Sequence, residues 1–107
     1  MYVAKDTGTP AQLDNGVIRT IMAYSDDIMV VRFDFIEGQE VARHQHMHTQ
    51  STYILSGQFE FEIDGQKHHC SAGDTLVFPS NTPHRCLCLE AGTLIDNFTP
   101  KRDDFLP

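Results

Sequence analysis

Alternation of apolar and polar side chains with a period of two residues is the feature that most constrains the fold of this chain. Phe59, Phe61 and Ile63 alternate with glutamates, and the dipeptide Asp64-Gly65 that follows them is favoured in two-residue hairpin turns. No stretch keeps a helical apolar period for three turns. The chain is therefore predicted to be all-β.

Further strands are expected on both sides of this hairpin, bounded by the Ser, Asp, Asn, Gly and Pro residues that favour turns. The expected strands are Val17 to Tyr24, Ile28 to Phe35, Ser51 to Leu55, Thr75 to Phe78, His84 to Leu89 and Thr93 to Phe98. Ala91-Gly92 is expected to turn the chain between the last two. Short strands at regular intervals favour a closed barrel or a double-sheet jelly roll, because both remove or protect sheet edges. In the polar tail, Phe105 and Leu106 are expected to pack on the barrel or on a partner subunit.

Length and charge exclude several classes of function. A chain of 107 residues is expected to form a single domain spanning residues 1–107. Its formal net charge of −7 argues against a nucleic-acid or anionic-membrane partner, because either would need a cluster of Lys and Arg. We find neither a signal-peptide pattern nor an apolar run of membrane-span length, so a cytoplasmic protein is expected. Cys70, Cys86 and Cys88 cannot all pair and are expected to be reduced and mostly packed.

A group of histidines is the first candidate for chemistry. His44 and His46 are two residues apart, which places them on the same face if they lie on a strand, so both could bind one ion. His84 follows a proline-containing loop and is the natural third imidazole, and the amide oxygen of Gln50 could complete the set. The alternative interpretation is that this histidine-rich segment is simply an exposed polar stretch. His48 is interpreted as a residue beside the metal site, a substrate-facing residue or an exposed one.

The glycines around these residues resemble the first motif of the cupin superfamily, here at residues 38–57. Five residues separate Gly38 from His44, three separate His46 from Gln50, and six separate Gln50 from Gly57. Glutamine stands where that motif usually has glutamate.

A second segment, residues 73–88, resembles the second cupin motif. Five residues separate Gly73 from Pro79, and four separate Pro79 from His84. Asn81 replaces the usual glycine and Cys88 the usual asparagine. The two resemblances, in the right order, imply a single-domain cupin, which is a jelly-roll barrel also described as a double-stranded β-helix.

Glutamine in place of glutamate changes the expected chemistry. Three neutral imidazoles and a neutral amide leave the full charge of a divalent ion uncompensated, which makes the ion a stronger Lewis acid. Such a site favours polarising an oxygen of a carboxylate-bearing substrate over oxygen chemistry. The ligand set does not select between nickel, zinc, iron and manganese.

A narrower resemblance covers residues from about Asp26 to Leu106. The segments HQHMHTQ, STYILSGQFEFEIDG and LIDNFTPKRDDFL look like those of the small cupins called KdgF, which act in pectin and alginate breakdown. Members of that family are reported to linearise 4,5-unsaturated monouronates. The resemblance implies a homodimer, a small sugar-acid substrate from pectin or alginate, and catalytic positions at Asp96, Phe98 and Arg102.

The residues themselves allow these roles and leave alternatives open. Asp96 and Phe98 share a strand face, so Asp96 could act as an acid/base beside the ion or be a hydrogen-bonded strand-end residue. Phe98 could stack on the sugar or pack in the core. Arg102 could bind the substrate carboxylate or pair with Asp103 or Asp104.

The predicted function is a metal-dependent, isomerase-type enzyme that opens unsaturated uronates to linear 5-keto sugar acids without net redox change. One alternative is a cupin dioxygenase that acts on a small enolic substrate. Another is a cupin without enzymatic activity that binds a sugar or an anion. His68 and His69 are interpreted as structural residues.

Overall fold

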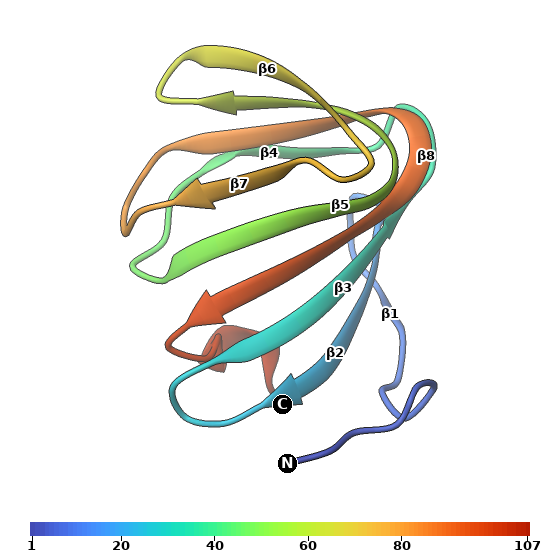
Figure 1. Cartoon of the computed structure of the whole chain (residues 1–107), viewed down its shortest axis with the longest axis vertical. Helices are drawn as coiled ribbons and strands as arrows, with labels where there is room; N and C mark the ends of the chain where they lie inside the picture. Colours follow the sequence, from blue (N-terminus) through green and yellow to red (C-terminus); the bar gives the residue numbers. More distant parts are fainter.

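Two long strands, β5 (Thr49–Ile63) and β8 (His84–Thr99), organise the computed structural model, which describes all 107 residues. They pair antiparallel along nearly their whole length, from Thr49 opposite Thr99 to Ile63 opposite His84 (Figure 1). Each strand therefore passes through both halves of the molecule.

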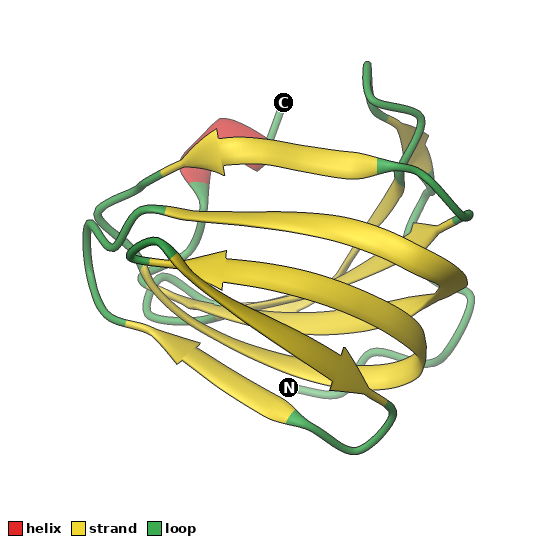
Figure 2. Ribbon diagram, turned by 90° about the horizontal axis from the view of Figure 1, so that it is seen from above, coloured by secondary structure: helices red, strands yellow, loops and turns green.

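The remaining strands flank this central pair and complete one curved eight-stranded sheet, which folds into two halves. The first half holds β4 (Glu40–His44) beside β8 and β6 (Gln66–Ser71) beside β5. The second half holds β7 (Thr75–Phe78) beside β5, and β3 (Met29–Phe35), β2 (Ile18–Tyr24) and β1 (Ala11–Gln12) in succession beside β8. Figure 2 shows the strands curving around a common interior. The predicted all-β, jelly-roll fold is confirmed.

Glycines allow β5 and β8 to cross from one half of the sheet to the other. The pairing register shifts between Ile54 and Phe59, which is typical of a β-bulge, and Gly57 has a φ of 88° within that segment. Gly92 faces it so closely that a Cβ on Gly92 would overlap the carbonyl oxygen of Ser56. The prediction of a turn at Ala91-Gly92 is wrong, because the glycines bend a continuous strand and do not end it.

The predicted hairpins are confirmed. β2 and β3 pair across the segment that contains Ser25, Asp26 and Asp27. Asp64 and Gly65 connect β5 to β6 and have φ values of 49° and 82°. Positive φ at both central residues is the requirement of the turn that this dipeptide favours.

The barrel interior holds a main apolar cluster and a smaller one. The main cluster contains Val17, Phe35, Ile54, Phe59, Phe61, Cys70, Phe78, Cys86, Cys88 and Leu94. The smaller one contains Met29, Val31 and Phe98. All three cysteines are free and buried, as expected.

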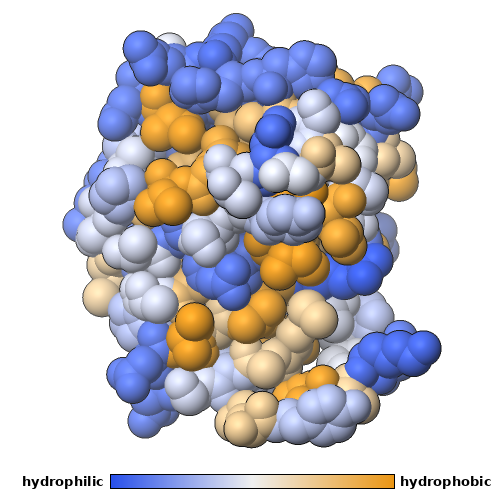
Figure 3. Space-filling view, viewed as in Figure 1, coloured by the Kyte–Doolittle hydropathy of each residue, from blue (hydrophilic) through white to orange (hydrophobic).

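The surface and the tail complete the fold. Hydrophilic residues gather at the end of the molecule where the edge strand β6 lies (Figures 1 and 3), and exposed polar residues on an edge oppose pairing with another chain.

The tail packs on its own barrel, where the Phe105 ring meets the rings of Phe33 and Phe98 edge-on at 6.3 and 5.6 Å. The structure has no helix with the length and apolar character needed to span a membrane.

The close approach of Gly92 to Ser56 gives a test of the strand crossing. Gly92→Ala should lower the free energy of unfolding by more than about 2 kcal/mol, because the new methyl group meets backbone that moves only if β5 and β8 separate. Gly65→Ala is the control, since its Cβ meets no atom within 4 Å and only its positive φ costs about 1–2 kcal/mol. Urea unfolding measures both. A smaller loss for Gly92→Ala than for Gly65→Ala would contradict this account.

Candidate metal centre

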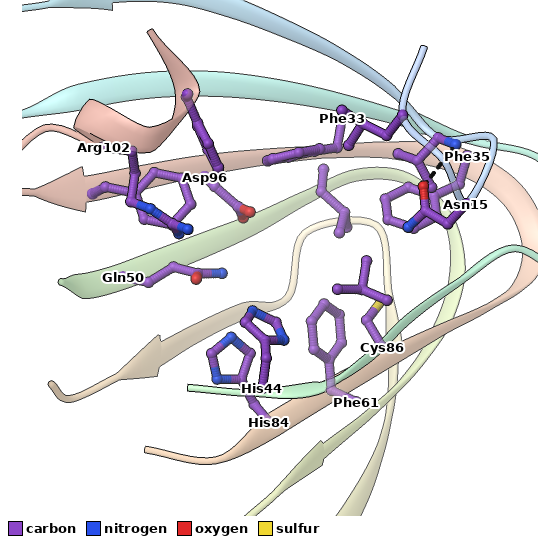
Figure 4. Close-up of a pocket in the computed structure, with 16 residues that line it drawn as sticks. Asn15, Phe33, Phe35, His44, Gln50, Phe61, His84, Cys86, Asp96 and Arg102 are labelled. Atoms are coloured by element: carbon purple, nitrogen blue, oxygen red, sulfur yellow. Dashed lines mark hydrogen bonds between the residues drawn. The ribbon is translucent and has the colours of Figure 1, made fainter. Parts of the chain in front are cut away.

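A cavity of about 180 Å³ opens inside the barrel, and it is lined by the candidate functional residues His44, Gln50, His84, Asp96, Phe98 and Arg102. Figure 4 shows His44 and His84 on one side of it, with Gln50, Asp96 and Arg102 across from them. Aromatic and aliphatic side chains line its other end, including Phe33, Phe35 and Phe61. The cavity thus has a polar end and an apolar end.

The three histidines predicted as metal ligands converge at the polar end. His44, the last residue of β4, is paired in register with His84, the first residue of β8, and their rings lie 4.3 Å apart. The His46 ring lies 5.2 Å from that of His84 and 5.6 Å from that of His44. One nitrogen from each ring can be chosen so that all three lie within 4.8 Å of one another. Two nitrogens bound to one ion at 2.0–2.1 Å lie at most about 4.2 Å apart, so a small contraction suffices for binding.

The reason predicted for this convergence is only partly right. His44 and His46 were expected to share one strand face, but β4 ends at His44 and His46 lies in the connection that follows. The connection is held in place because the carbonyl oxygen of His46 accepts a hydrogen bond of 2.8 Å from the backbone N–H of Asn81. Asn81 has a φ of 61°, a conformation suited to the glycine usual at this place in the motif.

Backbone carbonyls orient all three imidazoles in the same way. Nδ1 of His44 lies 2.9 Å from the carbonyl oxygen of Ala42, and Nδ1 of His46 lies 2.9 Å from that of His48. Nδ1 of His84 lies 2.8 Å from the carbonyl oxygen of Thr82. A carbonyl oxygen only accepts, so each Nδ1 carries the proton and each Nε2 keeps its lone pair. This second hydrogen bond is the usual companion of a metal-bound histidine.

Burial keeps the imidazoles in the form that binds cations. It lowers the pKa of His84 to about 4, with a further contribution from the positive charge of Arg102. Burial and Arg102 also lower the pKa of His46. Both rings are therefore neutral at pH 7 and can donate a lone pair to a metal ion.

Gln50 presents its oxygen to the same point. It lies near the start of β5, is 6% exposed, and places Oε1 3.0 Å from Nε2 of His46. Its Nε2 donates a hydrogen bond of 2.9 Å to Oγ1 of Thr52. The His46 nitrogen and the Gln50 oxygen are thus two acceptors in contact, which is favourable only when a cation lies between them. The donor set fits a divalent metal ion.

Asp96 lies inside the barrel on β8, paired in register with Thr52 on β5. It is 6% exposed, and its Oδ1 accepts a hydrogen bond of 2.6 Å from the Thr52 hydroxyl. Burial raises the pKa of Asp96 to about 7, against the lowering effects of Thr52 and Arg102. A carboxyl group with this pKa can both accept and release a proton near neutral pH. Asp96 therefore faces the interior of the barrel and does not lie at the end of its strand.

Arg102 both lines the cavity and pairs with a neighbour. Its Nε and Nη2 donate hydrogen bonds of 3.0 and 2.8 Å to the carboxylate of Asp104, and its side chain is 11% exposed. Its guanidinium lies 4.9 Å from the centre of the Phe98 ring and 4.2 Å from that of Phe105. The ion pair with Asp104 therefore fixes the guanidinium at the cavity wall and leaves Nη1 unpaired.

The remaining candidates have clear positions. Phe98 is 2% exposed and lies edge-on to the His46 ring at 5.7 Å, so it packs against the site. His48 is half-buried beside His46, to which its carbonyl oxygen is bonded, and its own Nδ1 is buried without a partner. His68 and His69 are exposed on β6, away from the cavity.

Sequence reasoning missed two residues at this site. Thr52 connects Gln50 to Asp96, and Phe105 forms part of the cavity wall beneath Arg102. The period of two residues from Gln50 places Thr52 on the inner face and could have revealed it. Phe105 was expected only to pack, because its position depends on the path of the tail.

Comparisons with known proteins agree with this geometry. The model of the cupin domain family matches residues 31–94. The pectin degradation protein KdgF of Dickeya dadantii is 40% identical over 104 residues, which cover 94% of each chain.

Solved structures give the same result. The structure of KdgF from a Halomonas species matches with a TM-score of 0.92 and 35% identity, over 99% of this chain and 98% of that one. An RmlC-like cupin from Shewanella frigidimarina matches with a TM-score of 0.94 and 30% identity, over 98% and 95% of the two chains. The chain belongs to the cupin family and, within it, to the group of small cupins that includes KdgF.

Proposed function

We propose that this protein is a metal-dependent enzyme that converts 4,5-unsaturated monouronates to linear 5-keto sugar acids by ring opening and tautomerisation. The observation that carries the proposal is the convergence of three oriented imidazoles at a cavity that is also lined by an arginine and by a buried carboxyl group whose pKa is about 7. The relative from Dickeya is a pectin degradation protein, and pectin is a source of such uronates.

The proposed ligands are His44, His46, Gln50 and His84. A divalent ion held by them would supply Lewis-acid stabilisation of the negative charge that develops on the substrate oxygens. The four ligands are uncharged, which suits this role better than oxygen chemistry and disfavours the dioxygenase alternative.

Arg102 is the residue proposed to bind the substrate carboxylate. Its Nε and Nη2 are occupied by Asp104, so Nη1 is the group that is free to donate a hydrogen bond to that carboxylate. The low exposure of its side chain strengthens this interaction, because less water competes with it.

Asp96 is proposed to move the proton. As a carboxylate it accepts the proton of the C1 hydroxyl while the C1–O5 bond breaks, which leaves an aldehyde at C1 and an enolate at C5. The protonated Asp96 then donates that proton to C4, which gives the 5-ketone and returns the carboxylate. One proton leaves oxygen and one arrives at carbon, so the reaction is an isomerisation without net redox change.

The decisive measurement is the loss of the ultraviolet absorbance of an unsaturated galacturonate, followed beyond its spontaneous rate. The wild-type protein should accelerate this loss, and Asp96→Asn should reduce the acceleration by a factor of about 10²–10⁴ while metal content stays the same. Asp103→Asn is the matched control, because Asp103 is exposed and pairs only with Lys101. An unchanged rate in Asp96→Asn would remove this residue from the mechanism.

The ligand assignment has its own test. Replacing His44 and His84 together by alanine should abolish metal binding, since the pair provides two of the three converging imidazoles. Elemental analysis of the purified protein measures this, with circular dichroism to verify folding. The His68→Ala, His69→Ala double variant serves as the control and should keep its metal. Retention of a stoichiometric ion by the first variant would refute the proposed ligands.

A further inference from the structure

The Thr52 hydroxyl connects the proposed ligand Gln50 to the proposed acid Asp96. Thr52 lies on the inner face of β5 and is 1% exposed. Its Oγ1 lies 2.9 Å from Nε2 of Gln50 and 2.6 Å from Oδ1 of Asp96. The three groups form a buried hydrogen-bonded row across the paired strands β5 and β8.

The two hydrogen bonds of this row have fixed donors and acceptors. An amide nitrogen can donate a hydrogen bond but not accept one, so Oγ1 of Thr52 is the acceptor in its contact with Gln50. The hydroxyl has a single proton, and that proton is donated to Oδ1 of Asp96. Hydrogen bonds therefore run from Gln50 through Thr52 to Asp96.

The first consequence concerns the orientation of the Gln50 amide. With Nε2 bonded to Thr52, the carbonyl oxygen Oε1 faces the Nε2 atom of His46 and the point where the imidazoles converge. A flipped amide would present N–H to that point and would take the Thr52 proton away from Asp96. The buried carboxylate would then lose its hydrogen-bond donor, which is unfavourable in a site of low dielectric constant.

The second consequence concerns the two oxygens of Asp96. Oδ1 accepts the Thr52 proton, so a proton carried by Asp96 is placed on Oδ2. Oδ2 accepts no hydrogen bond from the protein, and Asp96 lines the cavity. Proton exchange with a ligand is thereby confined to one oxygen of the carboxyl group.

We propose that Thr52 is a positioning residue that holds the Gln50 oxygen on the cation site and directs proton exchange by Asp96 to Oδ2. The second half of this statement rests on the proposed function, whereas the first concerns cation binding alone. Thr52 acts through its neighbours, so its hydroxyl is required and its methyl group is dispensable.

Two substitutions separate the hydroxyl from the methyl group. Thr52→Val keeps the shape and removes the hydrogen bonds, whereas Thr52→Ser keeps the hydroxyl. Thr52→Val should weaken zinc binding by about 10–100-fold, measured by competition with a chromogenic chelator, as is typical when the partner of a metal ligand is lost. Thr52→Ser should recover zinc affinity to within about threefold of the wild type. The matched control is Thr75→Val on β7, which exchanges an exposed threonine.

The kinetic readout tests the second half of the proposal. At saturating zinc and with unsaturated galacturonate, Thr52→Val should lower kcat by about 10–100-fold while KM changes by less than about threefold. Thr52→Ser should restore kcat. Equal impairment of the Val and Ser variants would overturn the proposal, because packing and not the hydroxyl would then be responsible.

The test remains decisive if a variant does not fold or if the substrate is wrong. In the metal-free wild-type chain, the side-chain amide protons of Gln50 should exchange slowly with solvent, because one is bonded to Thr52 in the interior. Rapid exchange in the nuclear magnetic resonance spectrum would overturn the orienting role. If the wild-type protein does not act on unsaturated galacturonate, the proposed function fails, whereas the role toward Gln50 is refuted only by rapid amide exchange or by wild-type zinc affinity in Thr52→Val.

Discussion

The pairing of β5 with β8 is the interaction on which the fold and the site both depend. Gln50 and Thr52 come from β5, and His84 and Asp96 come from β8, so one pair of strands positions four of the residues at the polar end of the cavity. Both strands cross between the two halves of the sheet at their glycines. This crossing lets His84, in one half of the barrel, face Gln50 and Asp96 in the other.

Polar groups inside a small barrel are tolerated because almost every one is satisfied. An unpaired buried polar group costs about 1–3 kcal/mol, a large fraction of the stability of a domain this size. Here the imidazole Nδ1 atoms are bonded to backbone carbonyls, and Gln50, Thr52 and Asp96 are bonded to one another. What stays unpaired is the set of lone pairs at the point of convergence, together with Oδ2 of Asp96 and, beside the site, Nδ1 of His48. The polar groups that hold the site in place are thus hydrogen-bonded, and the atoms that the proposed chemistry needs are free to bind a ligand.

Much of this arrangement could be predicted from the sequence, because it follows from the spacing of a few residues along the chain. The distances between Gly38, His44 and Gln50 and between Gly73 and His84 locate the proposed ligands, and alternation places Asp96 inside. The continuous course of β8 could not be read from Ala91-Gly92, since a glycine that bends a strand has the same local signal as one that ends it. Thr52 was missed for a related reason: threonine is common on strands, and its importance here depends on its neighbours across the sheet.

The charge of the site differs from that of the whole chain, and this difference supports the proposal that an acidic protein binds an anionic substrate. The chain has a net charge of −7, yet Arg102 lies close enough to lower the pKa of His46, His84 and Asp96 alike. Glutamate at position 50 would place a second carboxylate near Asp96 and raise the pKa of Asp96 further by repulsion. Glutamine avoids that charge, so Asp96 remains able to ionise near neutral pH. In the proposed function, the cation and Arg102 would then attract the substrate carboxylate. Under the proposed function, a neutral ligand at position 50 would therefore favour both substrate binding and proton transfer.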